Sequence, residues 1–216
     1  MEETMNIGSN LSSSFGYAKD GLVGHWVRWI LLIISCIIFP LMMGYQLRVM
    51  RGESPAPEAD NCVKMLIDGI LYCIIAFIYM IPLIIIAMVT MGPGVFSLMT
   101  NPSAVATGFG ALAIGLIIFI IVAISISLFE TIAIVNFARK ESFGAAFAFG
   151  DILGKIKEIG WISLFIQVLV LEIVFSIIYF VLGIIPVLGW LLMIILAPMF
   201  SIWSAKYFCN IYENAQ

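Results

Sequence analysis

The chain has 216 residues, of which 63% are hydrophobic and 11% are charged, and its mean hydropathy is +1.15. About a quarter of the residues in a soluble domain are charged, so this composition excludes an ordinary water-soluble protein. A net charge of −3 with only ten Lys and Arg residues, and no stripe of basic and aromatic residues, also excludes nucleic acid as a partner.

Residues 1–24 are polar and rich in small side chains, and we expect a loosely ordered tail there. Its middle, around Phe15 and Tyr17, can form a short interfacial helix. We expect residues 25–216 to form a single transmembrane domain. Its first apolar run predicts a span over about 26–48, which Pro40 interrupts. Two alternatives stay open: one crossing, or a re-entrant hairpin folded at Pro40, and they place the N-terminus on opposite sides of the membrane.

The longest uncharged stretch runs from Gly69 to Phe129, 61 residues without one Asp, Glu, Lys or Arg. A hydrocarbon core about 30 Å thick needs about 20 apolar residues for each helical crossing. The stretch therefore predicts two spans, over about 63–91 and 103–138, with a turn between them. We expect the first of these to end at Gly92-Pro93, because Gly permits a C-terminal turn and Pro does not continue a helix.

The last two apolar runs predict spans over about 160–183 and 187–209. The short connection between them requires antiparallel neighbours. The preceding segment, residues 142–158, predicts an amphipathic helix on the membrane surface, either as a docking face or as an elbow that sets the angle of the next span. The whole pattern predicts an all-α polytopic transmembrane helical bundle of about five spans with one interfacial amphipathic helix.

Lys and Arg residues concentrate in alternate connections and near the C-terminus. Because basic loops stay on the cytosolic side, we expect a multi-pass protein of the cell (plasma) membrane with a cytosolic C-terminus.

Two carboxylates lie inside predicted spans. Glu172 is near the midpoint of the fourth span, and Ser176 and Tyr179 follow it at i+4 and i+7, on one helical face. Glu130 lies nearer the cytosolic end of the third span. A charge at the centre of a bilayer costs about 2.5–3.5 kcal/mol. These residues are therefore candidates for a proton- or cation-linked site, or for protonated acids that hydrogen-bond between helices.

The segment from Gly44 to Gly69 reads GYQLRVMRGESPAPEADNCVKMLIDG, and IIPVLGW follows at 184–190. These motifs resemble those of the domain of unknown function 4013 family, small polytopic membrane proteins found mainly in archaea. The resemblance implies a membrane class and supplies no catalytic residue. Two arginines of the segment lie near several acids, which predicts a cytosolic ion-pair cluster between the first and second spans, formed by Arg48, Arg51, Glu53, Glu58, Asp60 and Asp68. The alternative is that the arginines contact anionic lipid headgroups.

No catalytic motif is recognisable, and the four cysteines have no C-x-x-C spacing, so we predict no catalytic residue, metal or cofactor. Enzymatic activity stays open, with a non-enzymatic structural, assembly or partner-binding role favoured. The alternative is a small transporter or channel-like protein with Glu172 in its path. Expected partners are the lipid bilayer and other membrane proteins or further copies of the chain.

Overall fold

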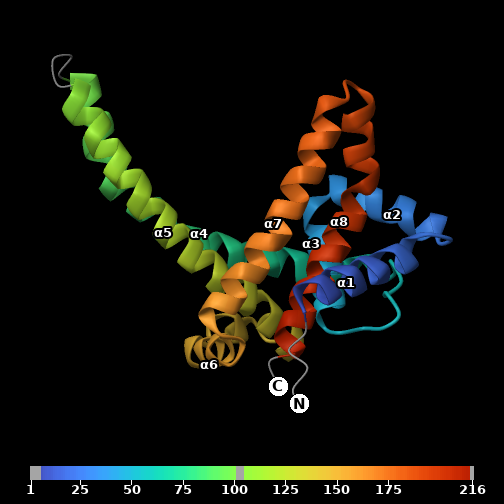
Figure 1. Ribbon diagram of the computed structural model, residues 1–216. Coiled ribbons are helices and arrows are strands. Elements are labelled where there is room, and N and C mark those ends of the chain that lie inside the picture. The colour runs from blue at the N-terminus through green and yellow to red at the C-terminus, as the bar shows by residue number, and fades with distance from the viewer. Residues whose placement is uncertain (1–5, 101–104, 215–216) are drawn as a thin grey trace. The chain divides into compact units, whose positions relative to one another are not determined.

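The computed structural model describes residues 6–100 and 105–214, and the regular structure within them is entirely helical. The chain divides into two compact units, which are described separately. Unit 1 comprises Met1–Cys73 and Thr131–Gln216, and unit 2 comprises Ile74–Glu130. Figure 1 shows the order of the helices along the chain. The prediction of an all-α helical bundle is confirmed.

The first helix of unit 1, α1, runs from Ile7 to Leu22. The expectation of a loosely ordered tail is therefore wrong for these residues. Asn6 caps the helix by accepting a hydrogen bond from the Gly8 amide at 3.1 Å. The residues that α1 buries, including Asn10, Ser14 and Ala18, recur every four positions and pack against α8. Asn10 and Ser14 are polar, so the sequence lacks the apolar stripe that usually predicts a packed helix.

The first apolar run forms two helices, as a fold at Pro40 implies, rather than one continuous helix over 26–48. Helix α2 covers Trp26–Ile37 and α3 covers Phe39–Met50, with a break at Ile38. Pro40 lies in the first turn of α3, where its missing amide removes no intrahelical hydrogen bond. A 12-residue helix is about 18 Å long, so neither helix alone crosses a hydrocarbon core of about 30 Å.

Helix α4 (Cys62–Thr100) is longer than the predicted span over 63–91, whereas α5 (Val105–Lys140) is close to the predicted 103–138. Each helix contributes residues to both units. The expected stop at Gly92-Pro93 is wrong, because α4 continues through Pro93. The local packing in unit 2 explains this. A Cβ added at Gly94 would lie 2.9 Å from the Gly108 carbonyl oxygen, so α4 and α5 are closely packed antiparallel neighbours. A neighbouring helix of this kind lets a membrane helix tolerate proline.

The C-terminal half of unit 1 begins with a short 3₁₀ helix, η2 (Phe143–Phe147), followed by α6 (Phe149–Ile159). The predicted helix over 142–158 is thus divided at Ala148. Helices α7 (Trp161–Ile184) and α8 (Leu188–Glu213) form the expected antiparallel pair. Four helices in the described residues, α4, α5, α7 and α8, are long and apolar enough to cross a membrane. A fifth span arises if α1 and α2, bent by 106°, count as one.

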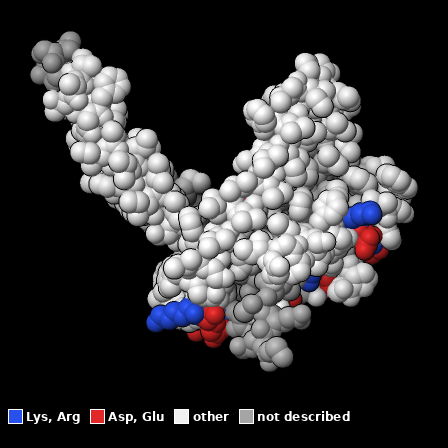
Figure 2. Space-filling model, in the orientation of Figure 1, with Lys and Arg blue, Asp and Glu red and all other residues white. Residues whose placement is uncertain are grey.

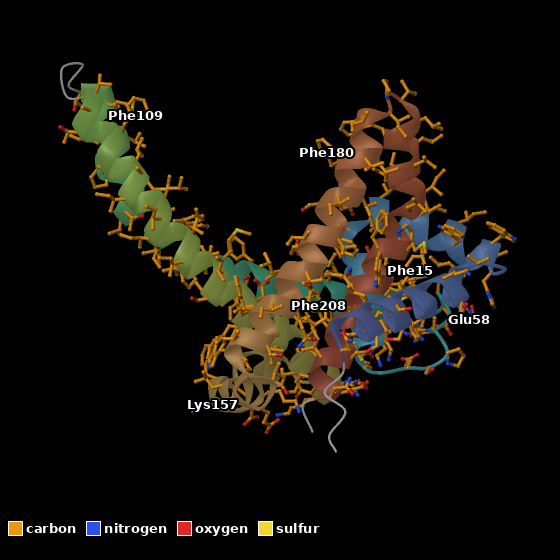
Figure 3. The ribbon with its side chains drawn as sticks, in the orientation of Figure 1. Phe15, Glu58, Phe109, Lys157, Phe180 and Phe208 are labelled. Carbon is orange, nitrogen blue, oxygen red and sulfur yellow. The ribbon has the colours of Figure 1, made fainter. Side chains whose placement is uncertain are left out.

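Charge is distributed unevenly over unit 1. From Trp161 to Ala205, which covers α7 and most of α8, Glu172 is the one charged residue. In Figure 2 the tip of the α7–α8 hairpin is white, and the visible charged side chains of unit 1 gather toward its opposite end. Figure 3 labels Phe180 near the tip and Lys157 on α6 at the charged end. Apolar helices with charges gathered at one end are typical of a membrane protein.

Candidate functional site

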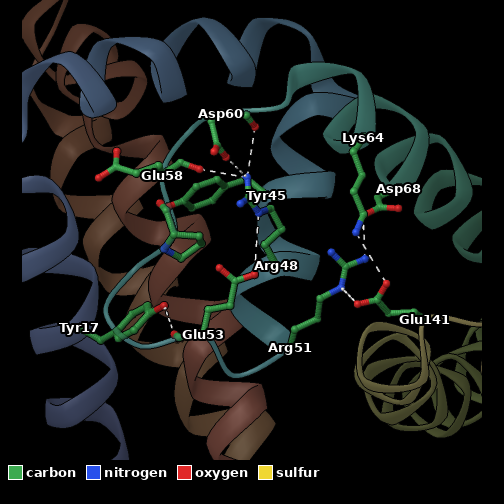
Figure 4. A network of polar contacts seen from close by, with 11 residues as sticks. Tyr17, Tyr45, Arg48, Arg51, Glu53, Glu58, Asp60, Lys64, Asp68 and Glu141 are labelled. Carbon is green, nitrogen blue, oxygen red and sulfur yellow. Dashed lines mark hydrogen bonds and ion pairs between the residues drawn. The ribbon is translucent and has the colours of Figure 1, made fainter.

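The polar cluster of unit 1 is built around the connection between α3 and α4, residues 51–61 (Figure 4). Arg48, in the last turn of α3, donates from Nη1 to the Asp60 carboxylate at 2.7 Å. The same nitrogen donates to the backbone carbonyls of Glu58 and Asp60 at 3.0 and 3.2 Å. The Glu53 carboxylate is 3.9 Å from Arg48 Nε. The Arg48 side chain therefore holds the connection against the end of α3, mainly through backbone carbonyls of the connection.

Arg51 links three helices at the charged end. Its Nη2 donates to Asp68 of α4 at 2.7 Å, and both side chains are 13% exposed. Its Nε lies 3.5 Å from the carboxylate of Glu141, which directly follows α5. Lys64 of α4 approaches the same carboxylate at 3.7 Å. A pair with so little water around it is costly to break from one side, because the remaining charge stays desolvated.

Glu58 takes a different partner from the predicted one. Its carboxylate pairs with Arg28 of α2, while only its backbone carbonyl meets Arg48. Arg28 is 7% exposed. It also donates to the carbonyls of Gly21 and Ala56 at 2.9 and 3.3 Å. No local pattern signals this pair, because Arg28 lies 30 residues from Glu58, and the chain between them includes α2, the break at Ile38 and α3.

The two arginines set the charge state of the connection. The pKa of the Glu58 carboxyl is lowered chiefly by the hydrogen bond from Arg28, and that of Asp60 by the hydrogen bond from Arg48. Both acids are therefore ionised at neutral pH. The predicted set of Arg48, Arg51, Glu53, Glu58, Asp60 and Asp68 thus lies in one region, but as linked pairs centred on Arg28, Arg48 and Arg51.

A cavity of about 680 Å³ lies between α1, the start of α2 and the connection. Its polar lining comprises Tyr17, Asp20, His25, Arg28, Glu53, Ser54 and Glu58. A neighbouring hollow of about 370 Å³ shares His25, Arg28 and Glu58 and adds the apolar Trp26 and Leu31. Arg28 and Tyr17 already have partners, since the Tyr17 hydroxyl donates to the Glu53 carbonyl at 2.7 Å.

A buried polar group fastens α1 to the end of α8. The Asn210 amide donates to Asn10 Oδ1 at 2.9 Å and to the Ser14 hydroxyl at 3.1 Å. Asn10 in turn donates to the Tyr207 carbonyl at 3.3 Å. These hydrogen bonds satisfy side chains that are almost fully buried, so they fix where α1 lies on α8.

The intramembrane candidates lie on surfaces of their units. Glu172, Ser176 and Tyr179 form an exposed stripe along α7, the α7 stripe. The Tyr179 ring packs edge-on against Phe175 and Phe200, with centroids 6.4 and 5.4 Å apart. None of the cavities described above is lined by this stripe. Glu130 belongs to unit 2 and is partly buried, with Tyr79 of the same unit near enough to interact with it electrostatically.

Metal binding has no geometric support in the part of the chain that the structure describes, where no three His, Cys, Asp or Glu side chains are placed to share an ion. All four cysteines are free thiols.

Comparison with known proteins identifies the chain at the level of its family. No curated protein and no solved structure matches it. The sequence model of one family, described as "Protein of unknown function (DUF4013)", matches residues 29–187. That range contains the whole α3–α4 connection and α7, and it ends at the α7–α8 turn. The chain therefore belongs to the DUF4013 family, and it is a membrane protein with apolar helices of spanning length.

Proposed function

We propose that this chain is a non-enzymatic, partner-binding membrane protein that joins another transmembrane helix through the α7 stripe. The observation that carries the proposal is the exposure of Glu172 on a helix of spanning length. Glu172 lies 11 residues into α7, about 17 Å along its axis, so its depth is close to the centre of a hydrocarbon core. An ionised carboxylate facing acyl chains there costs about 2.5–3.5 kcal/mol.

A second helix packed on the stripe removes most of that cost. Polar side chains that hydrogen-bond between membrane helices contribute about 1 kcal/mol each. Ser176 and Tyr179 extend the polar surface by two turns of α7 on the same face. The stripe thus offers three groups at helical spacing to a helix that carries hydrogen-bond donors or acceptors at the same depth. A second copy of this chain and a different membrane protein are the two occupants to distinguish.

The charged end of unit 1 is a poorer candidate for a partner site than the α7 stripe. Its arginines are already matched with the acids of residues 51–61 and with Asp68 and Glu141. A cluster whose charges are matched internally gains little from an incoming charged surface, because each new ion pair must replace an existing one. The cluster therefore serves mainly as an internal clamp.

A transporter or channel-like role, with Glu172 in the path, is the second candidate. Because Glu172 lies on the outside of unit 1, such a path would form between the stripe and a second helix packed on it. This candidate consequently shares the requirement for a partner helix at the α7 stripe.

Orientation is part of the proposal. We place the charged end of unit 1 and the C-terminus in the cytosol and the α7–α8 tip on the outer side of the plasma membrane. The support is the positive-inside rule, since α7 and α8 carry no Lys or Arg before Lys206.

The test compares Glu172→Leu with the wild type in mild detergent and in nanodiscs. Ile177→Ala is the matched control, because Ile177 is exposed on the same helix but lies about 140° away from Glu172. Light scattering measures self-association, and affinity isolation from native membranes measures a second protein. We expect Glu172→Leu to dissociate whichever complex the wild type forms, and Ile177→Ala to retain it. The same complex in all three proteins would contradict the proposal.

A further inference from the structure

The α2–α3 segment, residues 26–50, begins and ends against the same short piece of chain. At its start, Arg28 donates to the Ala56 carbonyl and pairs with the Glu58 carboxylate. Near its end, the Tyr45 hydroxyl donates to the Pro57 carbonyl at 2.8 Å. Arg48 donates to Asp60. Both ends of the segment are therefore fixed to residues 56–60. Because both ends lie at the same residues, the segment has not crossed from one side of the molecule to the other.

The helix that precedes the segment lies at the same end of unit 1. Tyr17 of α1 donates to the Glu53 carbonyl and lies under the Lys206 ammonium, 5.2 Å from its ring centroid. Asn10 contacts Tyr207 and Asn210 in the last turns of α8. The end of α8 also contacts α6, where Lys155 lies 5.0 Å from the Tyr212 ring centroid. One end of unit 1, the charged end described above, is therefore polar throughout: it comprises α1, α6, the connection and the last turns of α8.

Between its two fixed ends, the segment presents an apolar surface. One face of α2 is buried and contains Arg28, Leu32 and Ser35. The opposite face and the bend carry large exposed aliphatic and aromatic side chains, and Ile37 is 78% exposed. These residues are Val27, Ile30, Ile34, Ile37, Ile38 and Phe39. The indole of Trp29 donates to the Ile195 carbonyl at 2.8 Å, so α2 lies beside the apolar part of α8.

We propose that residues 26–50 form a re-entrant hairpin that enters one leaflet of the bilayer from the polar end and returns to it, with the bend at Ile37–Phe39 among the acyl chains. The partner of this apolar surface is lipid, because the surface continues the exposed apolar faces of α7 and α8 at the same depth. Trp26, the first residue of the segment, stacks on Trp29 with ring centroids 5.6 Å apart, and Trp29 reaches the apolar part of α8.

The hairpin has a consequence for the whole chain. Four helices then cross the membrane, and both the N-terminal helix α1 and the C-terminal end of α8 lie on one side. All ten Lys and Arg residues share that side, including Lys19 and Arg28, which a single crossing by residues 26–48 would place on the opposite side from the others. The inference is independent of the α7 stripe and of any partner.

Single cysteines in a background free of native cysteines test the hairpin in sealed vesicles of one orientation. Ser12→Cys and Lys19→Cys report on α1, Lys157→Cys on the charged end and Pro186→Cys on the α7–α8 tip; all four positions are exposed. The probe is a membrane-impermeant maleimide, and labelling in detergent shows that each thiol is reactive. We expect the α1 and Lys157 reporters to label from one face, and Pro186→Cys from the other.

A spin label at Ile37→Cys tests the lipid contact itself. We expect its relaxation to be accelerated by oxygen, which concentrates in acyl chains, and not by a water-soluble nickel chelate. Labelling of both α1 reporters from the same face as Pro186→Cys would overturn the hairpin. Access of the nickel chelate to position 37 would overturn its placement in the leaflet.

Discussion

Arg28 and Arg48 hold the connection between α3 and α4 from two sides, and the connection has no helix or strand of its own. Proximity in sequence predicts a cluster that contains Arg48 and Arg51, because four acids lie within 20 residues of both arginines. These acids are Glu53, Glu58, Asp60 and Asp68. The same argument misses Arg28, because α2 and α3 separate it in sequence from Ala56 and Glu58. Ion pairs between distant segments carry no local pattern, so only the fold reveals them.

Reversing the charge at position 48 tests the clamp. Glu at this position would lose the hydrogen bonds to the Asp60 carboxylate and to the Glu58 and Asp60 carbonyls. It would also place a second negative charge near the Glu53 carboxylate, which now lies 3.9 Å from Arg48 Nε. We expect Arg48→Glu to reduce the folded yield strongly and to lower the Tm. Fluorescence-detected size exclusion and a thermal ramp measure both. Lys157→Glu, at an exposed position of α6, is the control and should leave both unchanged. A normal yield and Tm for Arg48→Glu would show that the clamp is not needed.

The Arg28–Glu58 pair predicts a dependence on acid pH. Its hydrogen bond holds the pKa of the Glu58 carboxyl below the ordinary value of 4.5. A carboxyl whose pKa is lowered by folding stabilises the protein above its unfolded pKa, and this contribution disappears as the pH falls through the folded pKa. We therefore expect the wild type to have a higher Tm than Glu58→Gln near neutral pH.

The difference in Tm should stay constant down to the ordinary pKa of 4.5, shrink at lower pH, and be lost once the pH has fallen through the lowered pKa of the folded protein. Thermal ramps of the two proteins at each pH measure it. A difference in Tm that stays constant below pH 4.5 as well would show that Arg28 does not stabilise the ionised carboxylate.

At the scale of the elements, close packing between α3 and the start of α4 depends on two glycines. A Cβ added at Gly44 would overlap the Met65 carbonyl, and one added at Gly69 would overlap the Pro40 carbonyl. The sequence predicts where these helices lie approximately, but it does not predict this contact between backbones. The same limit explains α4, which continues past Pro93 because α5 packs against it there.

Alanine substitution tests this contact. We expect Gly44→Ala to destabilise the protein by about 1–3 kcal/mol, because backbone atoms must move to admit the methyl group. Gly154→Ala is the matched control: Gly154 lies inside α6 with open space around it. There alanine should be neutral or stabilise the helix by about 0.5–1 kcal/mol. Chemical or thermal unfolding in a single detergent compares the three proteins. Equal stability of Gly44→Ala and wild type would refute the close contact.

At the scale of the whole molecule, composition predicts the membrane class. Helices and closed β-barrels both satisfy the backbone in lipid, and continuous apolar runs of about 20 residues or more favour helices. The uncharged stretch from Gly69 to Phe129 correctly predicts two long helices, and the apolar runs after residue 160 correctly predict α7 and α8. The sequence leaves two forms of residues 26–50 open, because hydropathy does not distinguish one crossing from a hairpin of the same length.

The α7 stripe carries the proposed function, and a photoreactive side chain tests it in native membranes. Benzoylphenylalanine replaces Ser176 in one protein and Ile177 in the other, two exposed neighbours that point about 100° apart. After irradiation, the masses of the adducts identify what each position touches. We expect position 176 to form a protein adduct, with a second copy or a different membrane protein, and position 177 to form mainly lipid adducts. Lipid adducts alone at position 176 would contradict the proposal that α7 binds a partner helix there.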